Sequence, residues 1–267
     1  MEIPLFPLHT VLCPGIVLPL HIFEERYRAM TRHCLATGEP FGVVLIRDGR
    51  EIGTRGVATL AGVGAFAEIR KAGRYPDGRY DLLAAATGRF AIESVDAQRE
   101  PYLVARVTPL DDEVGDEPHA ERLAAVAVHR FVRYLDLMRA RDGETTDELD
   151  IRVEIDRADD GADDDPEDAL APSVTVRNAA KDDAEGDADQ VVHAGLTIPD
   201  DPTVLSYLLS GIVQVELPRR QALLEAETTV ERLEGLITLL EREVVLLGQR
   251  LRSFSPDPSL LGGPVRN

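Results

Sequence analysis

The first 23 residues combine short apolar runs with regularly spaced prolines. Ile3 to Phe23 reads IPLFPLHTVLCPGIVLPLHIF, and each of its four prolines removes a backbone donor, so extended structure is expected and a helix is excluded. Pro14-Gly15 has the chemistry of a turn, which predicts two short strands that meet at Cys13-Pro14-Gly15. Because a central strand needs every ladder hydrogen bond, the prolines inside these strands indicate edge positions or bulges.

The pattern changes to a helical one after Phe23. Residues 24–38 read EERYRAMTRHCLATG, with Glu24 and Glu25 in a first turn, Arg32 and His33 in a last turn and a glycine beyond. Acidic residues at the start and basic residues at the end complement the helix dipole. These residues therefore predict a short helix that ends before Gly38.

Short apolar stretches separated by turn residues continue to about residue 110. Phe41 to Ile46 predicts a buried strand, and Val57 to Arg70 predicts two short strands around the small residues AGVGA. Pro-Asp-Gly between Tyr75 and Tyr80 predicts a hairpin, whose second strand, Tyr80 to Thr87, leads through Gly88 into residues 90–95. A last strand follows around Ala105. Many short strands with one helix indicate a partly closed barrel.

A helical pattern begins after residue 111. The first predicted helix spans His119 to Arg141, Asp201-Pro202 begins a second, and a short helix follows Leu217-Pro218. Thr228 and Glu231 have the spacing of a capping box before the longest helix. The apolar side of the first helix comprises Leu123, Val126, Phe131, Tyr134, Leu135 and Met138, and that of the last comprises Val230, Leu233, Ile237, Leu240, Val244, Leu247 and Leu251.

These elements together predict an α+β fold with two subdomains. We expect a β-barrel over residues 1–110, a helical subdomain over 111–255, and a tail over 256–267. An acidic insert at 142–190 interrupts the helical subdomain. It holds 19 acidic residues against four basic ones, whereas the whole chain has a net charge of −19. High like charge predicts disorder there, although the alternation of Leu149, Ile151, Val153 and Ile155 also fits a local strand.

The apolar start of the chain has the composition of a strand pair and not of an export signal. No Lys or Arg precedes it, prolines interrupt it, and no small-residue cleavage site follows it. Cys13 and Cys34 are the two cysteines, and we expect both to be reduced core residues. The protein is therefore predicted to be cytoplasmic, without membrane contact.

Two stretches resemble the ends of a known domain. PLFPLHTVLCPGIVLPLHIFEERYRAM, at residues 4–30, resembles the start of the N-terminal substrate-binding domain of Lon proteases, and LPRRQALLEAETTVERLEGLITLLEREVVLL, at 217–247, is similar to that family's closing helices. The resemblance implies a PUA-like barrel at the N-terminal end. It also implies a stand-alone recognition module without ATPase or protease domains.

Catalytic motifs of that protease are missing from the sequence. No G-x-x-x-x-G-K-[ST] loop occurs, and the two lysines, Lys71 and Lys181, fall in a loop beside the barrel strands and in the acidic insert. Lon-type hydrolysis needs a Ser paired with a Lys, so neither peptidase nor ATPase activity is expected. We predict no enzyme activity, no catalytic residues and no cofactor.

Three other candidate sites are weak. Adjacent residues on a helix point about 100° apart, so His33-Cys34 is a poor base and nucleophile pair. His21 and Glu24 lack a second cluster with metal-ligand spacing. Asp156, Asp160, Gly161, Asp164 and Glu167 match positions 1, 5, 6, 9 and 12 of a calcium loop, but Ala158, Asp163 and Pro166 depart from its pattern. We therefore predict no metal site.

The predicted function is recognition of unfolded or apolar polypeptide segments, for proteolysis or buffering. Expected partners are polypeptide clients and a protease or chaperone, and the residues that line the binding surface are not identified by the sequence. RNA binding is the alternative for a PUA-like fold, but no basic cluster with interleaved aromatics occurs and nucleic acid is not expected. A scaffold or regulatory role, with the insert on a basic partner, stays open.

Overall fold

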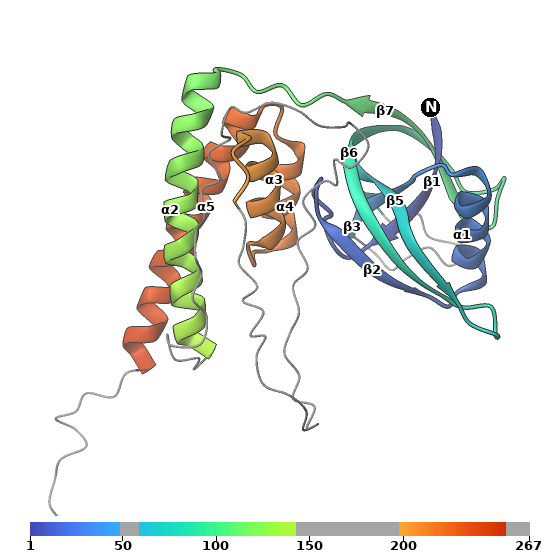
Figure 1. Cartoon of the computed structure of the whole chain (residues 1–267), viewed down its shortest axis with the longest axis horizontal. Helices are drawn as coiled ribbons and strands as arrows, with labels where there is room; N and C mark the ends of the chain where they lie inside the picture. The colour runs from blue at the N-terminus through green and yellow to red at the C-terminus, as the bar shows by residue number, and fades with distance from the viewer. Residues whose placement is uncertain (49–58, 143–197, 255–267) are drawn as a thin grey trace, which may run out of the picture.

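The computed structural model describes residues 1–48, 59–142 and 198–254, which form seven strands and five helices of an α+β fold. The strands gather on one side of the molecule and four of the helices on the other (Figure 1). Most of the acidic insert, the tail and the candidate calcium loop lie outside the described residues, as does the alternation from Leu149 to Ile155. The predicted division into two subdomains with an insert stays a prediction.

The strands pair in a closed ring. Strand β1 pairs β7, β7 pairs β6, β6 pairs β5, β5 pairs β3, and β3 pairs β1 again in parallel, while the other pairs are antiparallel. Closure removes the exposed edges that an open sheet would leave. The strands are β1 (Glu2–Leu8), β2 (Val17–Ile22), β3 (Phe41–Asp48), β4 (Thr59–Leu60), β5 (Val63–Arg74), β6 (Tyr80–Asp96) and β7 (Leu103–Leu110).

The longest strand, β6, pairs with two different strands along the same edge. It pairs β2 along Tyr80 to Ala85 and β7 along Arg89 to Asp96. Register shifts against β5 and β7 mark irregular positions that let the strand bend around the ring. Gly88 is paired with Phe66 inside this continuous strand.

The Pro14-Gly15 turn forms, but it does not make a hairpin. Gly15 has a φ of 81° and its N–H donates to the carbonyl of Ala86 at 2.9 Å. The prediction that the two flanking strands meet is wrong, because β1 pairs β7 and β3 whereas β2 pairs β6. The connecting segment instead buries Val11, Leu12 and Cys13 in the two cores of the barrel.

Each proline in β1 and β2 lies at a position that is in register with a neighbouring strand on one side only. Pro19 lies in β2, which pairs only β6 among the described strands, as expected for an edge. β1 has a neighbour on both sides, so the edge prediction is wrong for that strand. Its prolines are nevertheless each in register with one partner, Pro4 with Val104 of β7 and Pro7 with Val44 of β3.

Helix α1 (Glu25–Thr37) packs its buried face onto the barrel core that contains Phe6 and Phe41. Gly38 ends it in the left-handed conformation, with a φ of 74° and an N–H that donates to the carbonyl of Cys34. The helix runs one turn past Arg32 and His33, so the expected last turn came too early. Its buried residues are Tyr27, Met30, Thr31 and Cys34.

The helices that follow the barrel are built on two long parallel helices. These are α2 (Glu117–Asp142) and α5 (Thr229–Phe254), which run side by side in the same direction and are bridged by Arg130 and Glu241 at 3.1 Å. Helices α3 (Pro202–Ile212) and α4 (Leu217–Glu225) lie between this pair and the barrel (Figure 1). Asp201 caps α3 by accepting from the N–H groups of Thr203 and Val204, as predicted.

The two long helices bury only some of their predicted apolar residues. In α5, Leu233, Leu240 and Leu247 are buried as expected. In α2 the prediction is wrong for Val126, which is 43% exposed, because the buried face of this helix follows Ala124, Ala127, Phe131 and Tyr134, and Val126 lies off that face. The side chain of Thr228 accepts from the N–H of Glu231, but the Glu231 carboxylate reaches the N–H of Glu227 instead of closing the predicted capping box.

Candidate functional site

Three aromatic rings are gathered at the end of the barrel that lies far from α2 to α5. We call His21, Phe23 and Tyr75 the aromatic patch. Phe23 is 62% exposed and Tyr75 is 40% exposed. The His21 ring lies 6.3 Å from that of Phe23 and 6.1 Å from that of Tyr75. The β5–β6 hairpin that carries Tyr75 projects from the barrel beside α1 (Figure 1).

One carboxylate orients two of these rings. His21 and Asp81 are opposite each other in the β2–β6 register, and His21 Nδ1 lies 2.6 Å from Asp81 Oδ1. The hydroxyl of Tyr75 donates to the other oxygen, Oδ2, at 2.5 Å. Two hydrogen bonds hold the pKa of Asp81 below its usual range. The bond from Tyr75 has the larger effect and the bond with His21 the smaller. The same carboxylate raises the pKa of Tyr75, because ionised Tyr75 would lose the bond and repel Asp81.

An arginine in the hairpin turn supports the patch from the side. The Arg79 guanidinium lies 5.4 Å from the centre of the Tyr75 ring, and its Nε donates to Asp77 at 2.7 Å. Gly78, with a φ of 87°, supplies the left-handed residue that the turn needs. Hydrogen bonds thus hold His21 and Tyr75 in place, while Phe23 and Tyr75 stay partly exposed. Rigid exposed aromatics of this kind contribute strongly to binding of apolar groups, since little conformational freedom is lost on contact.

A concavity lies between α4 and α5. Its volume is about 460 Å³, within the range of small-ligand sites. Arg242 on its wall pairs with Glu243 at 3.0 Å and Glu216 at 3.5 Å, and Leu246 beside it is 38% exposed. Arg220, also on the wall, donates to the carbonyl of Val213, and its buried Nε has no hydrogen-bond partner among the described residues. The concavity is lined by Gln214, Val215, Glu216, Arg220, Arg242, Glu243, Leu246 and Leu247.

The structure does not assemble the candidate nucleophile and base. Cys34 is 3% exposed, and burial followed by the charge of Glu39 raises the pKa of its thiol to about 11. His33 Nε2 faces Glu39 at 3.5 Å. Cys13 is fully buried, and burial raises its pKa to about 11 as well. A thiol with such a pKa is protonated at neutral pH and is a poor nucleophile.

The candidate metal pair is also separated. His21 pairs with Asp81, whereas Glu24 accepts from Arg26 at 2.9 Å. Over residues 1–48, 59–142 and 198–254, no three His, Cys, Asp or Glu side chains are grouped as metal ligands. Lys71 is exposed on β5, and Lys181 lies outside the described residues. Within those same ranges, no helix is long and apolar enough to span a membrane.

The aromatic patch was missed by sequence reasoning, although some of its signal was visible. Tyr75 flanks the Pro-Asp-Gly turn that predicted the hairpin, and Phe23 ends the first apolar run. What the sequence did not show is that Asp81 would join residues from two distant segments. That contact depends on the β2–β6 register, which no local pattern specifies.

The fold and this surface define the class of protein. It is an α+β module in which a closed barrel with an exposed aromatic patch is joined to the helices α2 to α5. The chain belongs to the family described as the ATP-dependent protease La (LON) substrate-binding domain, which it matches over residues 2–242. The expected family is therefore confirmed.

Curated relatives that the chain matches are Lon proteases. The chain is 23% identical to the Lon protease of Cytophaga hutchinsonii over 246 residues, covering 92% of this chain and 24% of that protein. It is 32% identical to the Lon protease of Anaeromyxobacter dehalogenans over 124 residues, covering 46% of this chain and 14% of that protein. The chain therefore spans a quarter or less of the length of these curated relatives.

Solved structures share the fold. The Lon N-terminal domain protein from Xanthomonas campestris matches with a TM-score of 0.53 at 21% identity, covering 89% of this chain and 98% of that one. The N-terminal domain of Mycobacterium avium complex Lon protease matches with a TM-score of 0.50 at 18% identity, covering 90% and 98%. At this identity the likeness establishes the fold of the described residues and not the details of a binding surface.

Proposed function

We propose that this chain is a non-catalytic recognition module that binds unfolded or apolar polypeptide segments, with the aromatic patch as its contact surface. The observation that carries the proposal is the orientation of His21 and Tyr75 by Asp81 beside the 62% exposed ring of Phe23. Membership of a substrate-binding domain family supports it. Clients would be delivered to a protease or chaperone, or held in solution, in the cytoplasm.

The chemistry of the patch fits an apolar segment better than an anionic ligand. Phe23 and Tyr75 are exposed aromatic side chains, and the hairpin cation beside them, Arg79, is already paired with Asp77. Aromatic and apolar side chains of an unfolded polypeptide bury against such rings without needing a charge partner. We further propose that the barrel is PUA-like, and that nucleic acid is not its ligand because the chain has a net charge of −19.

Salt dependence tests this function directly. Binding of a fluorescently labelled, reduced and carboxymethylated protein would be compared with binding of a labelled single-stranded RNA, at low and high salt. Burial of apolar surface is weakly screened, so client binding should persist at high salt, whereas RNA binding depends on counterion release and should weaken steeply. RNA bound tightly at low salt, with no client bound at either, would replace this proposal by RNA binding.

A further inference from the structure

The segment between the barrel and the helical subdomain is pinned along its length. Residues 111–116 connect β7 to α2, and their carbonyls cap the start of α5: Thr229 N–H donates to Glu113 at 2.8 Å and Val230 N–H to Val114 at 3.2 Å. The first amides of a helix have no acceptor within it. Residues 111–116 therefore supply the acceptors that the first amides of α5 lack. The same hydrogen bonds hold this connection in place, where a flexible hinge would be expected.

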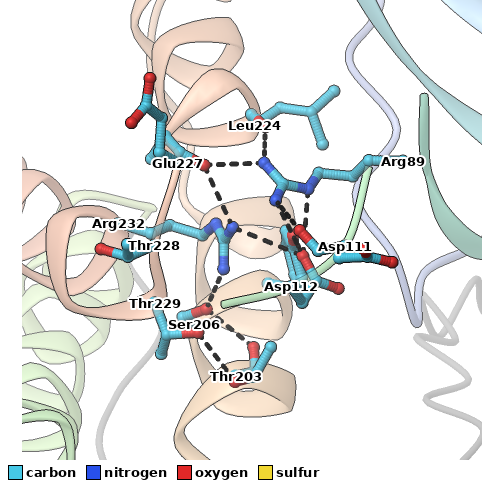
Figure 2. Close-up of polar contacts among 12 residues, drawn as sticks. Arg89, Asp111, Asp112, Thr203, Ser206, Leu224, Glu227, Thr228, Thr229 and Arg232 are labelled. Atoms are coloured by element: carbon cyan, nitrogen blue, oxygen red, sulfur yellow. Dashed lines mark hydrogen bonds and ion pairs between the residues drawn. The ribbon is translucent and has the colours of Figure 1, made fainter. Parts of the chain in front are cut away.

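An arginine of the barrel reaches into the helical subdomain next to this segment. Arg89, on β6, donates to the carbonyls of Leu224 at 2.9 Å and Ala226 at 2.7 Å, at the end of α4 (Figure 2). It also donates to the carbonyl of Asp111 at 3.2 Å and to the carboxylate of Asp112 at 3.1 Å. One side chain thus joins the barrel, the connection and α4.

A second arginine approaches the same point from α5. Arg232 is fully buried and donates to the carbonyl of Leu223 at 3.2 Å. It also donates to the hydroxyl of Ser206 at 3.1 Å (Figure 2). Its guanidinium carbon lies 3.7 Å from the centre of the Tyr207 ring, a cation–π distance. The Tyr207 side chain belongs in turn to the apolar core inside the barrel.

Asp112 is the carboxylate that these groups share. Its Oδ1 lies 2.9 Å from Arg89 and 3.8 Å from Arg232, and it accepts the hydroxyl of Tyr207. The two arginine side chains are 2% and 0% exposed, whereas that of Asp112 is 31% exposed. Removing the single carboxylate would leave two buried cations facing each other, which is strongly destabilising.

We propose that Asp112, Arg89, Arg232 and Tyr207 form a latch that joins the barrel and the helical subdomain into a single cooperative unit. The latch acts on the connection itself, because Asp112 belongs to it and the next two residues cap α5. The two subdomains predicted from the sequence then unfold together. Loss of the Asp112 charge releases the helical subdomain first, while the barrel keeps its closed ring of strands.

The test uses the full chain and the variant Asp112→Asn, with Asp111→Asn as the matched control. Asp111 is the adjacent residue, and its contact with the latch is through its backbone carbonyl. We expect Asp112→Asn to lower Tm by about 6 °C or more and Asp111→Asn to leave Tm within about 1 °C of the parent. In hydrogen exchange, peptides from 202–240 should lose protection in Asp112→Asn well before peptides from 63–74 do.

Equal Tm values and equal exchange in both variants would overturn the latch, as would a uniform loss of protection across both subdomains. If Asp112→Asn does not fold, Tyr207→Phe replaces it, because that change removes only the hydroxyl and keeps the ring over Arg232. Faster exchange confined to 202–240 in Tyr207→Phe would support the proposal. Exchange identical to the parent would contradict it.

Discussion

The ring of Phe90 lies directly over Gly64 in the β5–β6 pair. A methyl group at Gly64 would come within 2.6 Å of Phe90 Cζ and within 2.6 Å of the carbonyl oxygen of Val43. The same ring would meet a methyl group at Gly42, also at 2.6 Å. Phe90 therefore fills the barrel interior only because two neighbouring strands carry no side chain beside it.

This contact predicts that Gly64→Ala is destabilising. The ring and the Val43 backbone must both move, and overpacking of this kind costs about 1 to 3 kcal/mol. Gly62→Ala is the matched control, since a methyl group there meets nothing within 4 Å. Urea unfolding should separate the two variants by their midpoints. Equal midpoints would show that the barrel interior is looser than the structure indicates.

Phe23→Ser should weaken client binding without changing stability. The side chain is 62% exposed, so the free energy of unfolding should change by less than about 0.5 kcal/mol. If Phe23 anchors the client, affinity should fall at least about fivefold. Val126→Ser, at an exposed apolar position of α2, serves as the control and should bind as the parent does. Equal losses in both variants would argue against a site at the patch.

The carboxylate of Asp81 should titrate below the ordinary Asp value of about 3.9. Hydrogen bonds from Tyr75 and then His21 lower its pKa, so their stabilising effect is present above that ordinary value and is lost as pH falls through the lower, folded one. Carbon NMR of the carboxyl group measures the midpoint. Tyr75→Phe should raise it, and a midpoint that does not move would show that the hydroxyl is not the main cause.

Both thiols should resist alkylation in the folded protein at pH 8. Burial raises the pKa of Cys13 and of Cys34 from 9.0 to about 11, so little thiolate forms and access is poor. The unfolded chain ionises first, so stability should fall as pH rises from about 9 towards 11. Mass spectrometry after iodoacetamide treatment, with and without urea, provides the check. Labelling of either thiol in the folded protein would contradict the buried position of that thiol.

Leu240→Ala should lower the free energy of unfolding by about 2 to 5 kcal/mol, because Leu240 of α5 is fully buried in the core formed by the helices. Val245→Ala on the same helix is the control. Val245 is 57% exposed, and its loss should change stability by less than about 0.5 kcal/mol. Chemical denaturation of both variants gives the comparison, and a small cost at Leu240 would mean that this seam is not tightly packed.

Local chemistry in the sequence was enough to predict most of the elements and the family. Proline spacing excluded a helix before Phe23, Pro-Asp-Gly predicted the hairpin after Tyr75, and Asp201-Pro202 marked the start of α3. These signals work because each depends on a residue and its immediate neighbours. The same is true of the leucines of α5, whose spacing places Leu233 and Leu240 on one buried face.

Pairing and clustering across the chain were decided only by the tertiary structure. The β1 and β2 strands were expected to meet, yet β1 pairs β7 and β3 and thereby closes the ring, whereas β2 pairs β6 outside it. Asp81 and Asp112 are ordinary acidic residues in the sequence. One orients the aromatic patch and the other lies between two buried arginines, because strand register and helix docking bring together groups that are 60 and 120 residues apart.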